Sequence, residues 1–148
     1  MRRLLFFVFL AVVANAFGKP SVEVLNLRVE NLASPLGIDT SSPRFSWQLV
    51  SAEHDVVQEA YHILVASSES LLAQGQGDLW DSGNVESCRQ LWIDYGGQPL
   101  KSGRRAWWKV QVKTNKGRSS WSQPQAFSIG LLSESDWQGR WIGLEGLQ

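Results

Sequence analysis

Residues 104–127 read RRAWWKVQVKTNKGRSSWSQPQAF, and this stretch decides the fold. Its first half alternates between two sets of side chains, the period of two expected of a half-buried β-strand. One set is Ala106, Trp108, Val110 and Val112, and the other is Trp107, Lys109, Gln111 and Lys113. An Asn-Lys-Gly turn and a Trp-Ser-x-Pro segment follow, which predicts two antiparallel strands closed by that segment. The pattern is typical of a β-sandwich, a fold that is usually a scaffold rather than a catalyst.

The rest of the chain predicts short strands separated by turn signals. This is the pattern of an all-β, immunoglobulin- or fibronectin-like sandwich of about seven strands. No internal repeat, heptad pattern or low-complexity linker interrupts it. The expected strands are residues 24–29, 44–49, 60–68, a short one at 79–80, 91–95, 105–113 and 125–129.

Side-chain phase predicts which apolar residues share a face of each strand. The sets are Leu25, Leu27 and Val29 in the first strand, and Leu91, Ile93 and Tyr95 in the fifth. A single helical turn is expected at SESLLAQG, residues 68–75, with Ser68 as its cap and Gly75 as its stop.

The first sixteen residues have the form of a removable export signal. Arg2 and Arg3 precede an apolar run at residues 4–13, and Ala-Asn-Ala at residues 14–16 is a cleavage site. The run is about ten residues, shorter than the ~20 that a spanning helix needs, and an uncleaved anchor is the alternative. We therefore expect a secreted or periplasmic bacterial protein, with no membrane association after cleavage. The expected division is a signal peptide at 1–16, a β-sandwich domain at 17–130 and a tail at 131–148.

The charge of the chain bears on its binding partners, and its cysteine content bears on how the fold is stabilised. Without Arg2 and Arg3, the 14 basic side chains fall to 12 against 14 acidic ones, a formal charge of −2. No long run of either sign occurs, so the sequence predicts no nucleic-acid partner. Cys88 is the sole cysteine, so an internal disulfide is impossible and the apolar core must supply the stability.

The sequence predicts no catalytic site, no metal site and no cofactor. His54 and His62 stand eight residues apart without further ligands at metal-binding spacing, and Cys88 has no obvious base beside it. Nucleotide-binding and nucleophile-elbow fingerprints are absent from the sequence. Four carboxylates cluster within residues 78–94, and a glycosidase needs only two at a set separation. Turns and strand ends explain such acidic residues equally well.

The tryptophan side chains are the remaining indication of a binding surface. Trp47 and Trp108 share phase with apolar neighbours and should lie in the core, whereas Trp92 and Trp107 fall out of phase and should point outward. An outward tryptophan can stack on a sugar ring or pack against another domain. We favour the second use here, and an isolated solvated ring is a third possibility.

Several segments, in this order, resemble the N-terminal region of bacterial α-L-rhamnosidases over about residues 25–143. They are LRVEN, PLGIDTSSPRFSWQL, AYHILVASS, GDLWDSGNVES and RRAWWKVQV…SSWSQPQAFSIGLLSESDWQGRWIG. The resemblance implies an immunoglobulin/fibronectin-like sandwich, then further β-rich domains, one of which contacts carbohydrate, and an α/α toroid. In that family the toroid carries the catalytic carboxylates and hydrolyses terminal rhamnose with inversion. None of its positions falls within this sequence, so no residue here inherits a catalytic role.

The segment SDWQGRWIG resembles the junction at which the next domain of that family begins. A chain ending there would leave Trp137, Trp141 and Ile142 without partners, as an exposed apolar patch. We accordingly expect a truncated or incompletely sequenced member of the family, or a stand-alone remnant of one.

Three functions stay open from the sequence. The first is a non-catalytic accessory domain of a secreted α-L-rhamnosidase-like glycoside hydrolase, with the enzyme's other domains as partners. The second is a free carbohydrate-binding module that takes rhamnosylated glycans on Trp92 or Trp107. The third is a protein-interaction module of receptor or adhesin type. The candidate contact residues are Trp92, Trp107, Trp137 and Trp141.

Overall fold

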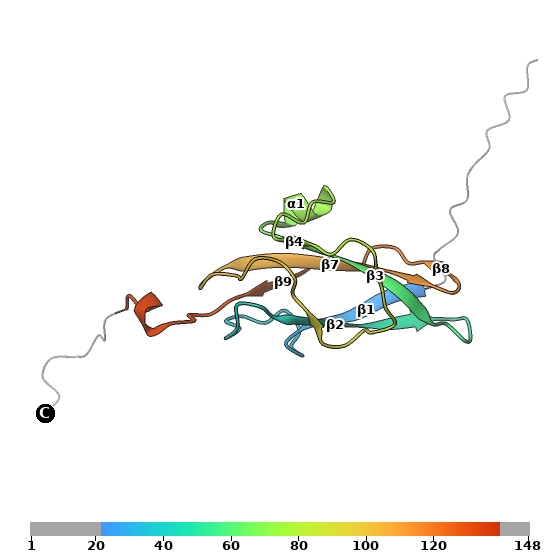
Figure 1. Ribbon diagram of the computed structural model, residues 1–148, viewed down its shortest axis with the longest axis horizontal. Helices are drawn as coiled ribbons and strands as arrows, with labels where there is room; N and C mark the ends of the chain where they lie inside the picture. The colour runs from blue at the N-terminus through green and yellow to red at the C-terminus, as the bar shows by residue number, and fades with distance from the viewer. Residues whose placement is uncertain (1–21, 140–148) are drawn as a thin grey trace, which may run out of the picture.

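The alternation of residues 105–113 forms the longest strand of the molecule, β7, and a two-sheet sandwich is built around it. The computed structural model describes residues 22–139 (Figure 1). The predicted signal peptide at 1–16 lies outside the described residues, as do Trp141 and Ile142. The elements are β1 (Val22–Val29), β2 (Arg44–Ser51), β3 (Gln58–Ala66), α1 (Glu69–Ala73), β4 (Trp80–Asp81), β5 (Val85–Glu86), β6 (Ile93–Asp94), β7 (Arg105–Thr114), β8 (Gly117–Arg118), β9 (Gln125–Ser128) and the 3₁₀ turn η1 (Glu134–Asp136).

The two sheets differ in size, and every strand pair within them is antiparallel. The smaller sheet has the order β1-β2-β6. The larger has the order β4-β3-β7-β8, with β5 also paired to β3 and β9 to β7. This confirms the predicted all-β sandwich. Four of the nine strands in the described part, β4, β5, β6 and β8, have only two residues each.

The core lies between the sheets and is centred on aromatic rings. The ring of Phe45 on β2 lies 4.6 Å from that of Trp108 on β7 and 5.9 Å from that of Phe127 on β9, measured between centroids. Trp47 is also fully buried, so the predicted core positions of Trp47 and Trp108 are confirmed. Each such side chain contributes about 1.5–3 kcal/mol by leaving water, and this burial stabilises a chain whose sole cysteine, Cys88, is exposed.

The prediction for the first strand was wrong at Leu25. Val24, Leu27 and Val29 are buried, but Leu25 is 40% exposed. The pairing of β1 with β2 shifts register between Leu25 and Arg28, and Asn26 within that interval has a left-handed φ of 51°. A bulge inserts a residue and moves the following side chains to the opposite face, so the simple alternation does not hold across it.

The predicted strand at residues 91–95 is also shorter than expected. Only Ile93 and Asp94 pair with β2, and Leu91 is 60% exposed instead of sharing the buried face. Trp92 has a φ of 56°, which bulky L-residues rarely adopt, and this conformation breaks the extended path. Ile93 and Tyr95 are buried as expected.

The helical turn is confirmed and covers the outer face of the larger sheet (Figure 1). Ser68 is its N-cap, with a side chain that accepts from the Leu71 N–H, and Gly75 follows its end with a φ of 77°. Leu72 of α1 packs against Leu64 of β3. No helix within residues 22–139 is long and apolar enough to cross a membrane.

Candidate interaction surfaces

Trp107 lies on the outer face of β7, away from the main core, as its phase predicts. The ring is half-buried and packs against the small outer cluster of Leu64, Ala66 and Leu72. The guanidinium of Arg105 lies over it, 4.8 Å from the ring centroid. A cation over an indole face is a stabilising arrangement, so one face of this ring already has a partner within the domain.

Trp121 is a second tryptophan on this outer face, and sequence reasoning assigned it no position. The Lys109 ammonium lies 4.8 Å from its ring centroid, and the His62 ring contacts it edge-on at 5.0 Å. Lys109 also donates to the Leu72 carbonyl at 2.6 Å, and burial lowers the pKa of its ammonium. We call Arg105, Trp107, Lys109, Trp121 and His62 the outer-face ladder.

The ladder ends in a His–Asp pair. His62 Nε2 lies 2.6 Å from Asp81 Oδ1. Burial would raise the pKa of the Asp81 carboxyl, but hydrogen bonds from the Gly83 N–H and from His62 lower it overall. Asp78 likewise accepts bonds from the backbone N–H and hydroxyl of Ser67. These carboxylates therefore have bonding roles at strand ends and turns of the fold.

Two serines position Trp121. The hydroxyls of Ser119 and Ser122 accept from the backbone N–H groups of Val112 and Val110, at 3.0 and 3.1 Å. These hydroxyls take the place of the carbonyl acceptors that a regular neighbouring strand would offer. The segment therefore stays bonded to β7 without the regular hydrogen-bond pattern of a hairpin. The predicted return strand is accordingly only the two residues of β8 before β9 resumes the pairing. The spacing of Ser119 and Ser122 is the sequence signal that could have placed Trp121.

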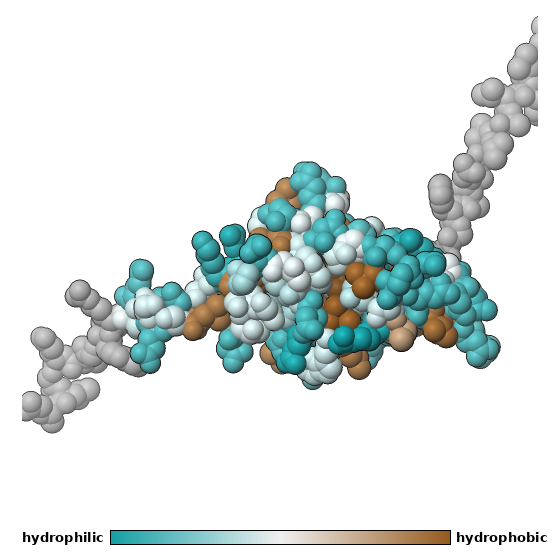
Figure 2. Space-filling model, in the orientation of Figure 1, coloured by the Kyte–Doolittle hydropathy of each residue, from teal (hydrophilic) through white to brown (hydrophobic). Residues whose placement is uncertain are grey.

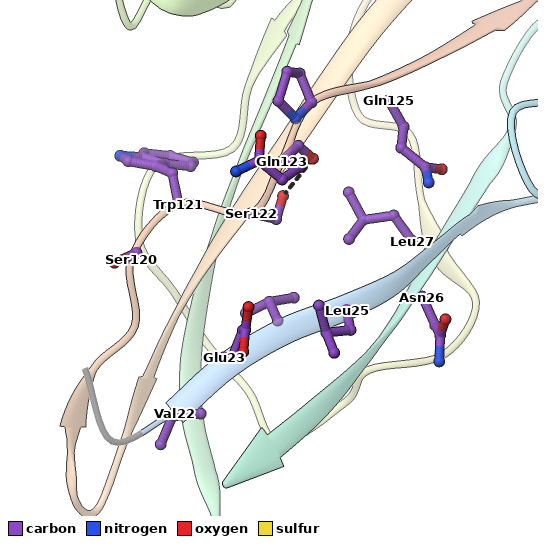
Figure 3. A pocket seen from close by; sticks show the side chains of 12 residues that line it. Val22, Glu23, Leu25, Asn26, Leu27, Ser120, Trp121, Ser122, Gln123 and Gln125 are labelled. Carbon is purple, nitrogen blue, oxygen red and sulfur yellow. Dashed lines mark hydrogen bonds between the residues drawn. The ribbon is translucent and has the colours of Figure 1, made fainter. Parts of the chain in front are cut away.

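A groove lies between β1 and the segment that carries these serines (Figure 3). Its volume is about 400 Å³, and its walls are residues 22–27 on one side and 120–125 on the other. The Ser122 hydroxyl, which donates to the Gln123 carbonyl, holds the second wall in place. Gln125 Oε1 is buried without a hydrogen-bond partner in the described part of the chain. The groove is an open edge between the sheets rather than an enclosed ligand cavity.

Trp92 is held on the smaller sheet by several polar contacts. Trp92 is 42% exposed, and the Arg44 guanidinium lies 4.4 Å from the centroid of its ring. The backbone N–H of Trp92 donates to Ser46 Oγ, and its backbone carbonyl accepts from the Arg89 guanidinium. The Arg44 guanidinium in turn forms two hydrogen bonds to the Glu30 carboxylate, the shorter at 2.7 Å. The hydrogen bond from Arg44 lowers the pKa of the Glu30 carboxyl.

Trp137 is placed differently from the other candidates. It follows η1, beyond β9, and is 62% exposed. The structure does not bring Trp92, Trp107 and Trp137 together, because they lie on the smaller sheet, the larger sheet and the exit segment respectively. Trp141 lies outside the described residues. Among residues 22–139, no group of three or more His, Cys, Asp or Glu side chains is arranged to hold a metal ion.

Residues 24–133 match a family model described as the Rha78A-like N-terminal immunoglobulin domain. The chain belongs to this family. It is 40% identical over 143 residues, 95% of the chain, to an α-L-rhamnosidase of Formosa agariphila, and 39% identical over 123 residues to one of Streptomyces avermitilis. The chain spans 15% and 12% of the length of these two relatives.

Solved structures of such enzymes contain the same sandwich. The crystal structure of the Streptomyces avermitilis α-L-rhamnosidase, complexed with L-rhamnose, superimposes with a TM-score of 0.76 over 82% of this chain and 12% of that one. The α-L-rhamnosidase of Dictyoglumus thermophilum gives 0.77 at 34% identity, over 82% of this chain and 14% of that one. The chain therefore matches the N-terminal immunoglobulin-like domain of α-L-rhamnosidases, which confirms the resemblance identified in the sequence.

Proposed function

We propose that this immunoglobulin-like domain is the leader domain of a secreted α-L-rhamnosidase that releases terminal α-L-rhamnose from glycans or glycosides. Within that enzyme the domain performs no chemistry and serves to pack against and position the domains that follow. The observation that carries the proposal is the extended identity to α-L-rhamnosidases of which this chain spans only 12–15%. The cations that lie over Trp92 and Trp107 support a structural use of these rings.

The activity is tested by cloning the gene through its stop codon and assaying the product with p-nitrophenyl α-L-rhamnopyranoside. We expect the full product to release nitrophenol and residues 17–148 alone to release none. The matched α-L-fucopyranoside and β-D-glucopyranoside are controls for sugar specificity. Hydrolysis of a control glycoside in preference to the rhamnoside, or hydrolysis by residues 17–148 alone, contradicts the proposal.

Export is a separate part of the proposal, supported by the positive, apolar and Ala-Asn-Ala regions of residues 1–16. We expect the exported protein to begin at Phe17 when its N-terminus is determined by mass spectrometry. An Ala16→Glu variant should retain the leader, because a charged residue does not fit the small-residue cleavage site. A cytoplasmic product that keeps residues 1–16 contradicts this part.

A second candidate function, sugar binding by this domain, is favoured by Trp92. Trp92 is the most exposed aromatic residue between β1 and β9, and its left-handed backbone costs about 1–2 kcal/mol. Such strain is often found at functional positions. Titration with L-rhamnose while following tryptophan fluorescence tests this function. It requires a saturable change that Trp92→Ala abolishes and Trp107→Ala retains, and a flat titration rejects it.

A further inference from the structure

The exposed apolar side chains of the domain are unevenly distributed. Ten large hydrophobic side chains in the described part are exposed, and five of them lie in two short segments, residues 32–36 and 131–137. They are Leu32, Leu36, Leu131, Leu132 and Trp137. Figure 2 shows apolar surface at the narrow region where the sandwich meets the exit segment. Leu36, at 86% exposed, is the least covered of the five.

Backbone hydrogen bonds hold these two segments side by side. Ile38 and Ile129 form a parallel bridge, and the Ser128 N–H donates to the Pro35 carbonyl at 3.0 Å. A Cβ built on Gly130 would lie 3.1 Å from the Gly37 carbonyl oxygen. The two segments therefore approach each other closely at these glycines. Because of this contact, the loop carrying Leu36 and the segment beginning at residue 131 form one surface, which we call the exit surface.

Polar contacts also hold the second segment of the exit surface. Ser102 Oγ donates to Asp136 Oδ2 at 2.5 Å and accepts from the Leu132 N–H at 3.0 Å. Ser133 and Asp136 complete a capping box around η1. A Cβ on Gly139 would approach the Trp137 ring to 2.9 Å, so the chain passes directly over this indole. These polar contacts therefore hold the segment that carries Leu132 and Trp137, whose side chains stay exposed.

We infer that the exit surface is the docking face for the segment and domain that follow it in the same polypeptide. This inference rests on the proposed function. The chain leaves the sandwich at this surface, and the family model ends within it, at residue 133. The Formosa agariphila relative matches 95% of this chain, which spans only 15% of that relative's length. The occupant is therefore the polypeptide after residue 139, whose first apolar residues are Trp141 and Ile142.

A fixed apolar surface beside the point of exit has a specific mechanical consequence. A linker without contacts would let the leader domain rotate freely, whereas burial of several leucines and a tryptophan at the junction sets one orientation. We place this contact at the exit surface and not at Trp92 or Trp107, because the rings of these two residues already lie near cations of the domain.

The test uses the full product of the gene and the trypsin site at Arg140, the residue that follows the described part of the chain in the sequence. We expect slow cleavage after Arg140 in the parent protein. Cleavage should be about tenfold faster in Leu36→Ser/Leu131→Ser and in Trp137→Ser, because proteolysis follows the population of the opened state. The control is Val50→Ser/Leu91→Ser, which replaces two apolar side chains, 49% and 60% exposed, on β2 and just before β6, and should leave the rate unchanged.

Other outcomes overturn the inference. Unchanged cleavage in both exit-surface variants means that the junction is not docked there. A reading frame that stops at Gln148 removes the covalent occupant. A dimer of residues 17–148 that the exit-surface variants dissociate, seen by light scattering, makes a second copy the occupant. Rhamnoside hydrolysis on the same preparations separates the two proposals. An active enzyme with an unprotected junction rejects only the docking, and a protected junction in an enzyme inactive on rhamnosides rejects only the proposed function.

Discussion

The outer face of β7 and the exit surface both carry tryptophan outside the main core, but they differ in the neighbours that surround its ring. On β7, the rings of Trp107 and Trp121 each lie under a cation of the domain, and α1 covers part of the cluster. At the exit surface, no cation lies over Trp137 among residues 22–139, and the neighbouring leucines are exposed as well. The rings of the first region have partners within the domain, whereas the second region leaves its apolar side chains exposed.

This difference shows why outward phase alone is a poor guide to function. The alternation along β7 places Trp107 and Lys109 on the outside, yet cation–π contacts and a short helix are sufficient to satisfy such a face. An exposed indole points to a partner only when the domain offers it no neighbour. The predictions below measure how strongly each region depends on contacts inside the domain.

The largest effect is expected at the inner face of β7, which sets the scale for the comparison. Trp108→Ala removes a fully buried ring that packs on Phe45. Substitutions of this kind cost about 3–5 kcal/mol. The measurement is the free energy of unfolding of residues 17–148 in urea. A loss below about 1 kcal/mol would show that the sandwich core is not organised around this ring.

The next effect separates the two outer regions directly. Trp121→Ala should lower the free energy of unfolding of the same chain by about 2 kcal/mol, because a half-buried ring loses its apolar contacts and its Lys109 partner. Trp137→Ala should change it by less than about 0.5 kcal/mol, as for other exposed positions. Equal losses in the two variants would mean that the exit surface is as complete as the outer-face ladder.

A smaller effect tests how Trp121 is positioned. Ser122→Ala leaves the buried Val110 N–H without its hydroxyl acceptor, and an unsatisfied buried donor costs about 1–2 kcal/mol. Ser120→Ala, at an exposed position in the same segment, should be neutral. Urea unfolding measures both, and near-ultraviolet circular dichroism reports whether the Trp121 environment changes with Ser122. An equal loss of unfolding free energy in both variants would contradict the proposed role of the Ser122 hydroxyl as the acceptor for the Val110 N–H.

The smallest effect concerns the contact that holds Trp92. The folded-state pKa of Glu30 is lowered by Arg44 below its ordinary value of 4.5. The carboxylate therefore contributes stability that is present above pH 4.5 and is lost as the pH falls through the lowered pKa. Glu30→Gln should make the unfolding free energy less dependent on pH below 4.5. If the unfolding free energy of the variant falls with decreasing pH as steeply as that of the parent, other carboxylates are responsible for the fall.

The sequence was sufficient where one local pattern decides the structure. Alternation placed Trp47 and Trp108 in the core, and the cap and stop signals placed Ser68 and Gly75 around α1. It failed at Leu25 and Leu91, because a bulge and a left-handed residue reverse the phase without leaving a strong local signal. A left-handed tryptophan, in particular, is stabilised by distant groups such as Ser46 rather than by its own preference.

The candidate site was partly predictable for the same reason. The resemblance to α-L-rhamnosidases predicted a junction at SDWQGRWIG and with it a role for Trp137. The leucines of the exit surface could not be grouped from sequence, because the bridge between Ile38 and Ile129 joins segments about ninety residues apart. Pairing over such a separation depends on the complete sandwich. The prediction that Trp107 contacts another domain stays a prediction, and the exit surface is the second place proposed for such a contact.

The most direct test of the account is amide hydrogen exchange of residues 17–148 alone, compared with the same residues in the full product of the gene. Docking at the exit surface predicts slower exchange at residues 36–38 and 130–137 in the full product, with no change around Trp107 and Trp121. Unchanged exchange at the exit surface, or protection that appears on the outer-face ladder instead, would contradict the account.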